Sequence, residues 1–264
     1  MLTYILNNKK IERNNIHSDR SHFRAIFSCK KAKILGEIKP KKPWSDTCTD
    51  PKIIAKKLLK NPDITGFSIL IDETFFGGNI GNIELIRHIW KPTLFKEFVF
   101  ETSQIDGASY YGYDAVLLIV KMFLWDKKRW EELSRPIRSE TENWAESSPW
   151  WKGVPEGGGW WKMGELTQLV RHCLTLNIEP LVEVDNASDL DEVLRTFSPN
   201  DITIGINCRD LDTLEIDRQR HFDYWRPEML SYHTIALSGI TDISQVSEYK
   251  EKYDGIVIGS LFTN

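Results

Sequence analysis

The chain has 264 residues, of which 41% are apolar and 27% are charged, and its formal net charge is −4. This composition provides a sizeable core and argues against wholesale disorder, and the length suits one large α/β domain, here taken as residues 1–264. The small negative charge gives no general attraction to nucleic acid or to an anionic membrane, and the longest apolar stretch, residues 115–120, is far too short to span a bilayer.

Eight short apolar runs recur along the chain and are typical of strands buried on both faces, as in parallel sheets. They span about residues 34–39, 66–71, 93–97, 114–120, 179–184, 201–206, 234–238 and 254–259. Most of the stretches between them have room for one helix, so the pattern predicts a (β/α)8 TIM barrel. An open doubly wound sheet is the weaker alternative, because no Gly-x-Gly-x-x-Gly follows the first run.

Two of the intervening stretches illustrate the expected helices. In residues 50–59, Asp50 is the expected N-cap and Pro51 the first helical residue. In residues 188–197, Ser188 is the expected cap. The apolar stripes expected to face the core are Ile53, Ile54, Leu58 and Leu59 in the first helix, and Leu190, Val193, Leu194 and Phe197 in the second.

The alternation breaks at two places. About residues 124–163 form a long insertion after the fourth strand, and they contain seven of the ten tryptophans and three consecutive glycines. An insertion of this size suggests a lid, a binding loop or an interface for a protein partner or for self-association; aromatic packing against the barrel is the alternative. At the other break, Asn264 follows the eighth run so soon that we expect no clear closing helix.

Charged and amide side chains end several of the apolar runs. A barrel would bring these groups to one mouth, where such enzymes build their active sites. They are Glu37, Lys39, Lys96, Glu183, Asn207 and Arg209. One of them alone is most often a surface charge or part of a structural ion pair. Together at matching strand ends they indicate catalysis, because neighbouring lysines and carboxylates adjust each other's pKa so that one gives and another takes a proton.

Glycine–serine pairs follow the last two runs. Ser238-Gly239 comes after the seventh run and Gly259-Ser260 after the eighth. In barrels, the backbone N–H groups of two such loops and a short helix hold a phosphate. The pattern therefore predicts a small-molecule phosphosugar substrate, but it does not name the reaction.

Cysteines and histidines give no sign of a metal site or of a disulfide framework. Cys29, Cys48, Cys173 and Cys208 include no Cys-x-x-Cys pair, and the six histidines include no His-x-x-x-His pair. The first residues lack the layout of a signal peptide. We therefore expect free buried thiols and a soluble, cytoplasmic protein.

Several segments, in order, resemble the indole-3-glycerol phosphate synthase family over residues 24–123 and 164–262. They are Gly36–Lys39 with Pro43, Phe67–Gly78, Leu94–Phe98, Ser103–Ile105, Gly112–Val120, Pro180–Val184, Ile204–Leu211, Ser238–Ile240 and Val257–Ser260. The Lys-acidic-Phe, Gln-Ile and Asn-x-Arg-Asp-Leu elements are the most specific. The resemblance implies a (β/α)8 barrel, a lyase of tryptophan biosynthesis and no metal or organic cofactor. The reaction would convert 1-(2-carboxyphenylamino)-1-deoxyribulose 5-phosphate into indole-3-glycerol phosphate, carbon dioxide and water.

The resemblance also implies roles for individual residues. Lys96 would be the general acid, and a pKa lowered by burial and neighbouring cations would suit that role. Lys39 with Glu37 would assist loss of water, and Glu183 would be a further acid–base or electrostatic group. Asn207 would bind substrate hydroxyls, and Arg209 would face the substrate carboxylate. Ser238 would be a further substrate-binding residue. The anthranilate slot would comprise Pro43, Phe76, Phe98, Leu117 and Ile119, and the phosphate site Lys42, Gly239, Gly259 and Ser260.

The chain departs from the family pattern at several points. Leu237 replaces the glutamate that the family carries before Ser238-Gly239, which predicts weakened activity. Lys42 replaces a phosphate-loop serine and can still bind phosphate as a point charge. The amino-terminal extension is short and poorly matched, and the tryptophan-rich insertion is foreign to the family. Two alternatives therefore remain: a divergent barrel with another phosphosugar substrate, and a non-catalytic barrel that binds a partner.

Overall fold

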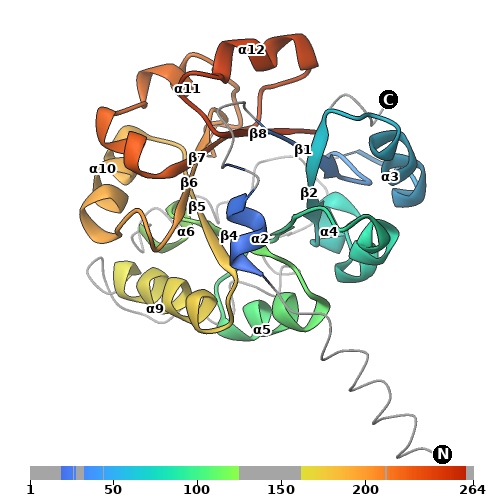
Figure 1. The fold of residues 1–264 in the computed structure, drawn as a ribbon, viewed down its shortest axis with the longest axis horizontal. Coiled ribbons are helices and arrows are strands. Elements are labelled where there is room, and N and C mark those ends of the chain that lie inside the picture. The colour runs from blue at the N-terminus through green and yellow to red at the C-terminus, as the bar shows by residue number, and fades with distance from the viewer. Residues whose placement is uncertain are drawn as a thin grey trace, which may run out of the picture.

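Eight parallel strands close into a barrel in the computed structural model, which describes residues 19–25, 27, 33–43, 45–124, 162–211 and 213–259 (Figure 1). The strands are β1 (Lys33–Ile38), β2 (Ile64–Leu70), β3 (Thr93–Lys96), β4 (Ala115–Ile119), β5 (Glu179–Val184), β6 (Thr203–Asn207), β7 (His233–Leu237) and β8 (Gly255–Ile258). Each strand pairs with the next, and β8 pairs with β1. The predicted (β/α)8 barrel is confirmed, and each predicted strand lies within about two residues of its observed position.

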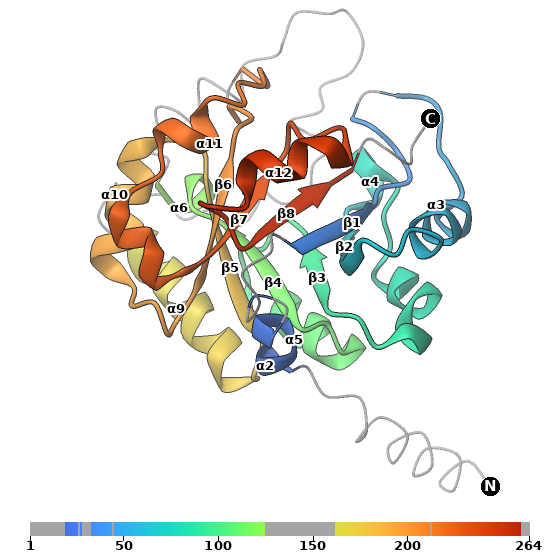
Figure 2. The same cartoon turned by 45° about the horizontal axis from the view of Figure 1, so that its top comes forward.

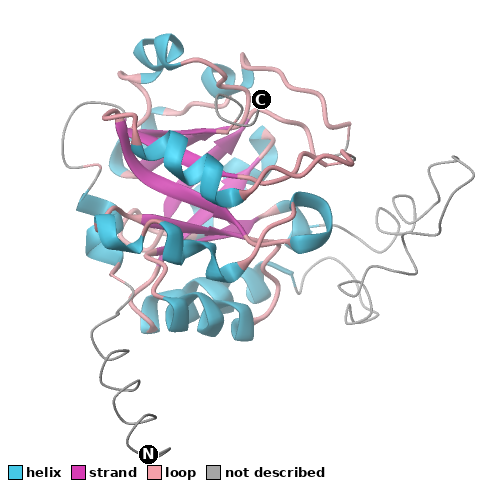
Figure 3. Ribbon diagram, turned by 90° about the vertical axis from the view of Figure 1, so that its right-hand side faces the viewer, coloured by secondary structure: helices cyan, strands magenta, loops and turns pink. Residues whose placement is uncertain are grey.

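Helices and short 3-10 turns surround the barrel, as Figure 3 shows from the side. The α-helices are α2 (Arg20–Ala25), α3 (Pro51–Leu59), α4 (Glu73–Phe76), α5 (Thr102–Tyr111), α6 (Lys121–Leu124), α9 (Lys162–Thr175), α10 (Ala187–Thr196), α11 (Arg220–Asp223) and α12 (Val246–Tyr249). The 3-10 turns span Ile80–Leu85, Arg87–Ile89, Pro227–Ser231 and Ile243–Gln245. Among the residues that the structure describes, no helix has both the length and the apolar character needed to cross a membrane.

Alternating side chains of the strands supply two separate cores. One set packs outward against the helices and includes Ile38, Phe95 and Val182. The other fills the barrel, and it comprises Leu35, Leu94, Ala115, Leu117, Ile119, Leu181, Ile235, Leu237 and Val257, with Phe23 and Phe27 from the amino-terminal segment. This alternation is the period-two pattern of a strand, and it aims every second side chain at the barrel axis.

Helix boundaries confirm one sequence prediction and correct another. Asp50 caps α3, with its carboxylate 2.8 Å from the backbone N of Lys52, and Pro51 is the first helical residue. The predicted cap Ser188 is wrong, because α10 begins at Ala187 and Asn186 caps it by accepting from the N–H of Asp189 at 2.9 Å. Both Asn and Ser are good caps, so composition alone did not separate them.

Burial corrects two further expectations. Ile53, assigned to the buried stripe of α3, is 51% exposed, whereas Ile54 and Leu58 are fully buried. Cys48 is exposed, contrary to the expectation of buried thiols, while Cys173 and Cys208 are buried and free. Cys29 lies outside the described residues.

The amino-terminal helix α2 closes the bottom of the barrel, at the end opposite the carboxyl ends of the strands (Figure 2). Phe23 and Phe27 join the interior core, and Arg20 and Arg24 both bind the buried carboxylate of Glu179 on β5. Arg24 does so with two N–H groups, at 2.8 and 3.0 Å. Sequence reasoning did not identify this helix or its arginines.

Three sequence expectations concern residues beyond the described ranges. Residues 125–161 contain nearly all of the tryptophan-rich insertion, residues 260–264 bear on the closing helix, and residues 1–18 belong to the amino-terminal extension. These expectations stay predictions.

Candidate active site

Two lysines meet one carboxylate at the carboxyl end of the barrel. Lys96 Nζ, at the end of β3, lies 2.9 Å from Oε1 of Glu37, and Lys39 Nζ, just after β1, lies 2.8 Å from Oε2 of the same residue. Glu37 is buried. Burial opposes ionisation of this carboxyl, but the two ammonium groups outweigh it and lower the Glu37 pKa to about 2. The ionised carboxylate therefore holds both lysines in place.

A second buried carboxylate, Glu183 at the end of β5, lies close to this group. Asn207 Nδ2, at the end of β6, donates to Oε1 of Glu183 at 2.8 Å, and Asn207 Oδ1 accepts from the backbone N–H of Arg209 at 2.9 Å. Burial raises the pKa of Glu183 more than Lys96 and Asn207 lower it. This carboxyl therefore takes up a proton more readily than an exposed glutamate does.

The predicted lowering of the Lys96 pKa is wrong. Burial does lower the Lys96 pKa, but Glu37 and Glu183 together outweigh burial, so that the pKa is raised. The neighbouring cation Arg209 opposes them only weakly. Lys96 is therefore a firmly charged ammonium. The mutual electrostatic influence of these groups shows that the barrel brings the predicted strand-end set together.

Close contacts surround Gly239, after β7, and Gly259, after β8, the two glycines predicted to bind phosphate. Ser238 and Gly239 both have positive φ, at 65° and 68°. A Cβ at Gly239 would lie 2.5 Å from Cys208 Sγ, and one at Gly259 would lie 2.1 Å from Glu37 Oε2. A Cβ at either position would therefore force a neighbouring side chain to move, and the positive φ of Gly239 adds backbone strain for any other residue there. Lys42 is exposed in the loop after β1, and Ser260 lies outside the described residues.

An aromatic pair stands beside the barrel mouth. The rings of Phe76 and Phe98 are stacked with centroids 6.3 Å apart. Phe98 packs against the interior cluster that contains Leu117 and Ile119. The stacking and this packing connect four of the predicted slot residues, whereas Pro43 is exposed. Met122 and Leu211 also pack against the interior cluster, and the sequence pattern gave them no role in the slot.

Leu237 occupies the barrel interior at the position where the family pattern has glutamate. It is fully buried and is paired in register with Asn207. A Cβ at Gly205 would lie 2.7 Å from Leu237 Cδ1, so the leucine fills the space above that glycine. This face of the site is therefore apolar.

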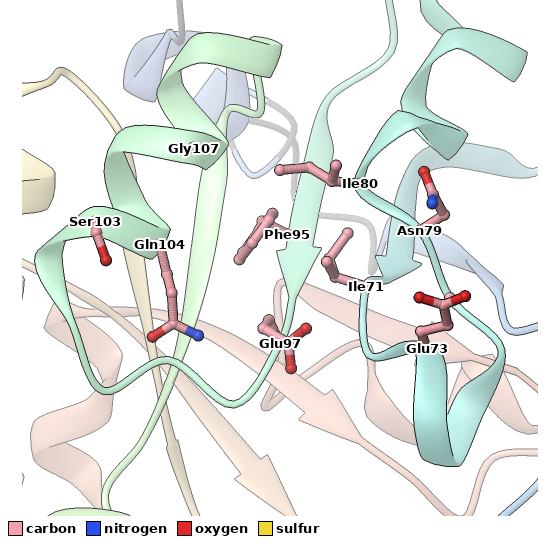
Figure 4. Close-up of a pocket in the computed structure, with 10 residues that line it drawn as sticks. Ile71, Glu73, Asn79, Ile80, Phe95, Glu97, Ser103, Gln104 and Gly107 are labelled. Atoms are coloured by element: carbon pink, nitrogen blue, oxygen red, sulfur yellow. The ribbon is translucent and has the colours of Figure 1, made fainter. Parts of the chain in front are cut away.

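A separate pocket of about 370 Å³ lies outside the barrel wall, between the β2–α4 and β3–α5 segments (Figure 4). Its lining residues include Ile71, Phe95, Glu97 and Gln104. Burial raises the pKa of Glu97 to about 7, although its Oε1 accepts from the N–H of Phe98 at 2.7 Å. Lys96, the last residue of β3, contacts Glu37 at the barrel mouth, whereas its neighbour Glu97 lines this pocket. The pocket is therefore separate from the lysine–glutamate cluster.

The described residues contain no grouping of three or more His, Cys, Asp or Glu side chains that could hold a metal ion. The arrangement at the mouth instead combines two ammonium groups, one ionised carboxylate and one carboxyl of raised pKa. Such a set is able to donate a proton at one point of a substrate and accept one at another.

The chain is similar to one protein family and to several curated proteins. The model of the family described as "Indole-3-glycerol phosphate synthase" matches residues 5–140 and 161–264. Curated proteins named indole-3-glycerol phosphate synthase match from Staphylococcus aureus (28% identical, 93% of this chain, 80% of that protein), Aquifex aeolicus (29%, 90%, 78%) and Lactococcus lactis (27%, 86%, 72%).

Solved structures are similar in fold alone. A crystal structure of tryptophan synthase from M. tuberculosis matches with a TM-score of 0.54 at 9% identity, covering 92% of this chain and 89% of that one. A tryptophan synthase alpha-subunit from Pyrococcus furiosus matches with a TM-score of 0.53 at 11% identity, covering 86% and 87%.

Proposed function

The chain belongs to the indole-3-glycerol phosphate synthase family, and we propose that it catalyses the family's ring closure. In that reaction, 1-(2-carboxyphenylamino)-1-deoxyribulose 5-phosphate becomes indole-3-glycerol phosphate with loss of carbon dioxide and water. The enzyme is a carboxy-lyase of tryptophan biosynthesis. The observation that carries the residue-level proposal is the Lys96–Glu37–Lys39 cluster at the barrel mouth.

Ring closure requires an acid at the ribulose carbonyl. The anilino ring carbon attacks the carbonyl carbon, and the carbonyl oxygen becomes an alkoxide, which Lys96 protonates. An alkoxide is far more basic than a lysine amine, so the raised pKa of Lys96 does not prevent this transfer. It ensures instead that the acid is in its charged form when substrate arrives, and that the ammonium polarises the carbonyl beforehand.

Two eliminations complete the reaction. The bond to the carboxylate breaks, carbon dioxide leaves, and its electron pair restores the aromatic ring. The new hydroxyl then leaves as water with a proton from Lys39, which Glu37 holds at 2.8 Å. The raised pKa of Glu183 suits it to accept the proton from the neighbouring carbon. Asn207 donates to Glu183 and would also bind a substrate hydroxyl.

Different residues at the barrel mouth would bind the phosphate, the ring carboxylate and the aromatic ring of the substrate. The backbone of Gly239 and Gly259, with Ser260, would hold the phosphate, and Lys42 would add a point charge. The guanidinium of Arg209, with Ser238, would face the ring carboxylate. Phe76 and Phe98 would flank the anthranilate ring.

The test is product formation by purified protein, followed by chromatography because ten tryptophans would mask indole fluorescence. The unmodified chain is expected to convert the substrate, and Lys96→Met to abolish turnover while retaining the fold and the binding of a reduced substrate analogue. Undiminished turnover in Lys96→Met would refute the assigned mechanism. Binding without turnover in the unmodified chain would refute the catalytic function itself.

A further inference from the structure

A buried ion pair lies beside the active site, and the proposed mechanism does not use it. Lys121 is the first residue of α6 and lies two positions after the end of β4, and Asp185 directly follows β5. Lys121 Nζ lies 2.7 Å from Asp185 Oδ2, and the two side chains are 6% and 2% exposed. Two charges are rarely buried for stability alone, because desolvation offsets much of their attraction.

Asp185 also binds the segment that carries Arg209. The oxygen that accepts from Lys121, Oδ2, accepts from the backbone N–H of Leu211 at 3.0 Å. The other oxygen, Oδ1, accepts from Asn186 Nδ2 at 3.1 Å. A single carboxylate therefore links the ends of β4 and β5 to the loop after β6.

Backbone and side-chain contacts across that loop hold Arg209 against the residues that follow it. Arg209 forms an antiparallel bridge with Ile216, and its Nη1 donates to the carbonyl of Leu214 at 2.9 Å. The N–H of Asp217 donates to the carbonyl of Cys208 at 3.0 Å. These bonds transmit the position of the anchored backbone to the guanidinium.

We propose that Asp185, held by Lys121, is a positioning residue that anchors the backbone of Leu211 and, through residues 208–211 and 213–217, sets Arg209 against the ring carboxylate of the substrate. The inference rests on the proposed function, since it assumes an anthranilate-type ligand. An Arg–carboxylate contact depends strongly on orientation, because the planar guanidinium binds best when both partners are aligned. A backbone anchor one residue beyond Asp210 limits rotation of the loop about its base.

Two matched double variants isolate the anchoring bond. Lys121→Met with Asp185→Asn removes both charges and keeps an oxygen acceptor for the N–H of Leu211. Lys121→Met with Asp185→Leu removes both charges and the acceptor, with nearly the same side-chain volume. Because each variant removes the charges of Lys121 and Asp185 together, neither leaves one member of this pair charged and buried beside a neutral partner, and thermal unfolding verifies that both variants fold.

The readout is the dissociation constant of two ligands, measured by calorimetry. One is the reduced analogue with the 2-carboxyphenylamino group, and the other is the same molecule without the ring carboxylate. The Asn variant should bind both within about twofold of the unmodified chain. The Leu variant should lose about tenfold in affinity for the carboxylate ligand only, the worth of one charge-assisted contact. In an Arg209→Met background, this selective loss should disappear.

The proposal would be overturned if the Leu variant bound the carboxylate ligand as tightly as the Asn variant does. It would also be overturned if the Leu variant lost the same affinity for both ligands. Turnover is measured separately on the unmodified chain. Its absence there, with the selective loss still present in the Leu variant, would refute the proposed function while supporting Asp185 as the positioning residue.

Discussion

Glu37 and Lys96 form the central contact of the site, with Lys96 Nζ 2.9 Å from Glu37 Oε1. The two residues are 59 positions apart in the sequence, and the barrel brings them together. Burial opposes the charged form of both partners, and the charge of each partner favours ionisation of the other. The acid that starts the reaction therefore depends on a carboxylate that does not itself transfer a proton in that step.

The first prediction is that Glu37→Gln slows turnover and shifts its pH dependence. Without the carboxylate, burial and Arg209 lower the pKa of Lys96, so the alkaline limb of the kcat profile should move to lower pH. We expect a loss of about 100-fold in kcat, the scale of one acid–base contribution. A profile that keeps its alkaline limb would show that Lys96 is not the titrating acid.

The second prediction concerns Gly259, whose added Cβ would lie 2.1 Å from Glu37 Oε2. Gly259→Ala should displace this carboxylate from Lys39 and reduce kcat by at least about tenfold. The control is Gly164→Ala in α9, where the Cβ meets nothing within 4 Å. That substitution should stabilise the helix by up to about 1 kcal/mol and leave the steady-state rate unchanged. Similar kinetics for both variants would contradict the predicted clash.

The third prediction separates the stability end of the barrel from the catalytic end. Arg24→Met removes two hydrogen bonds from Glu179, which is fully buried. Arg20 still binds Glu179 in this variant, so the loss of the charge-assisted bonds of Arg24 should cost about 1.5–3 kcal/mol of unfolding free energy, measured by urea denaturation. The kcat below the unfolding transition should remain within about twofold, because the carboxyl ends of the strands hold the chemistry. A large rate loss in folded Arg24→Met would contradict this division.

The sequence predicted the strands well because continuous apolar runs are a local signal. Glu183 and Asn207 were likewise found as polar residues that end such runs. The pKa of Lys96 was predicted in the wrong direction, because that direction depends on which carboxylates the folded barrel places beside it. A local pattern does not contain that information.

Long-range pairings were missed for the same reason. Arg24 and Glu179 are 155 residues apart, and Lys121 and Asp185 are 64 apart. Neither pair stands out in the sequence, since each member is an ordinary charged residue near a strand or in a short helix. The six-residue helix α2 is also too short to give a clear periodic signal.

The fourth prediction is a loss of stability in mild acid through His221. This residue is fully buried, and burial lowers its pKa to about 4. Its Nε2 lies 2.9 Å from the carbonyl oxygen of Leu237 and its Nδ1 lies 3.0 Å from the Tyr249 hydroxyl. The folded state keeps the ring neutral, whereas the unfolded chain binds a proton below about pH 6.5. Stability should therefore be complete above pH 6.5 and fall by about 3 kcal/mol towards pH 4.

Urea denaturation between pH 4 and pH 7 measures this loss, and His221→Gln is the matched control. Glutamine has both a donor and an acceptor but does not titrate, so the variant should be less stable at pH 7 and should lack most of the slope between pH 6.5 and 4. An unchanged slope in the variant would assign the acid sensitivity to other groups.

The last prediction tests whether Leu237 limits the rate. Leu237→Glu places a carboxyl beside Asn207 in the barrel interior, where the family pattern has one. We expect kcat to rise, because a second carboxyl of raised pKa could share the proton transfers assigned to Glu183. Burying the polar group should cost about 1–3 kcal/mol of stability. Leu237→Gln is the control, since it has the same cost but no exchangeable carboxyl proton. If Glu and Gln slow the reaction equally, the apolar wall at Leu237 is itself required, and the remaining carboxylates suffice for catalysis.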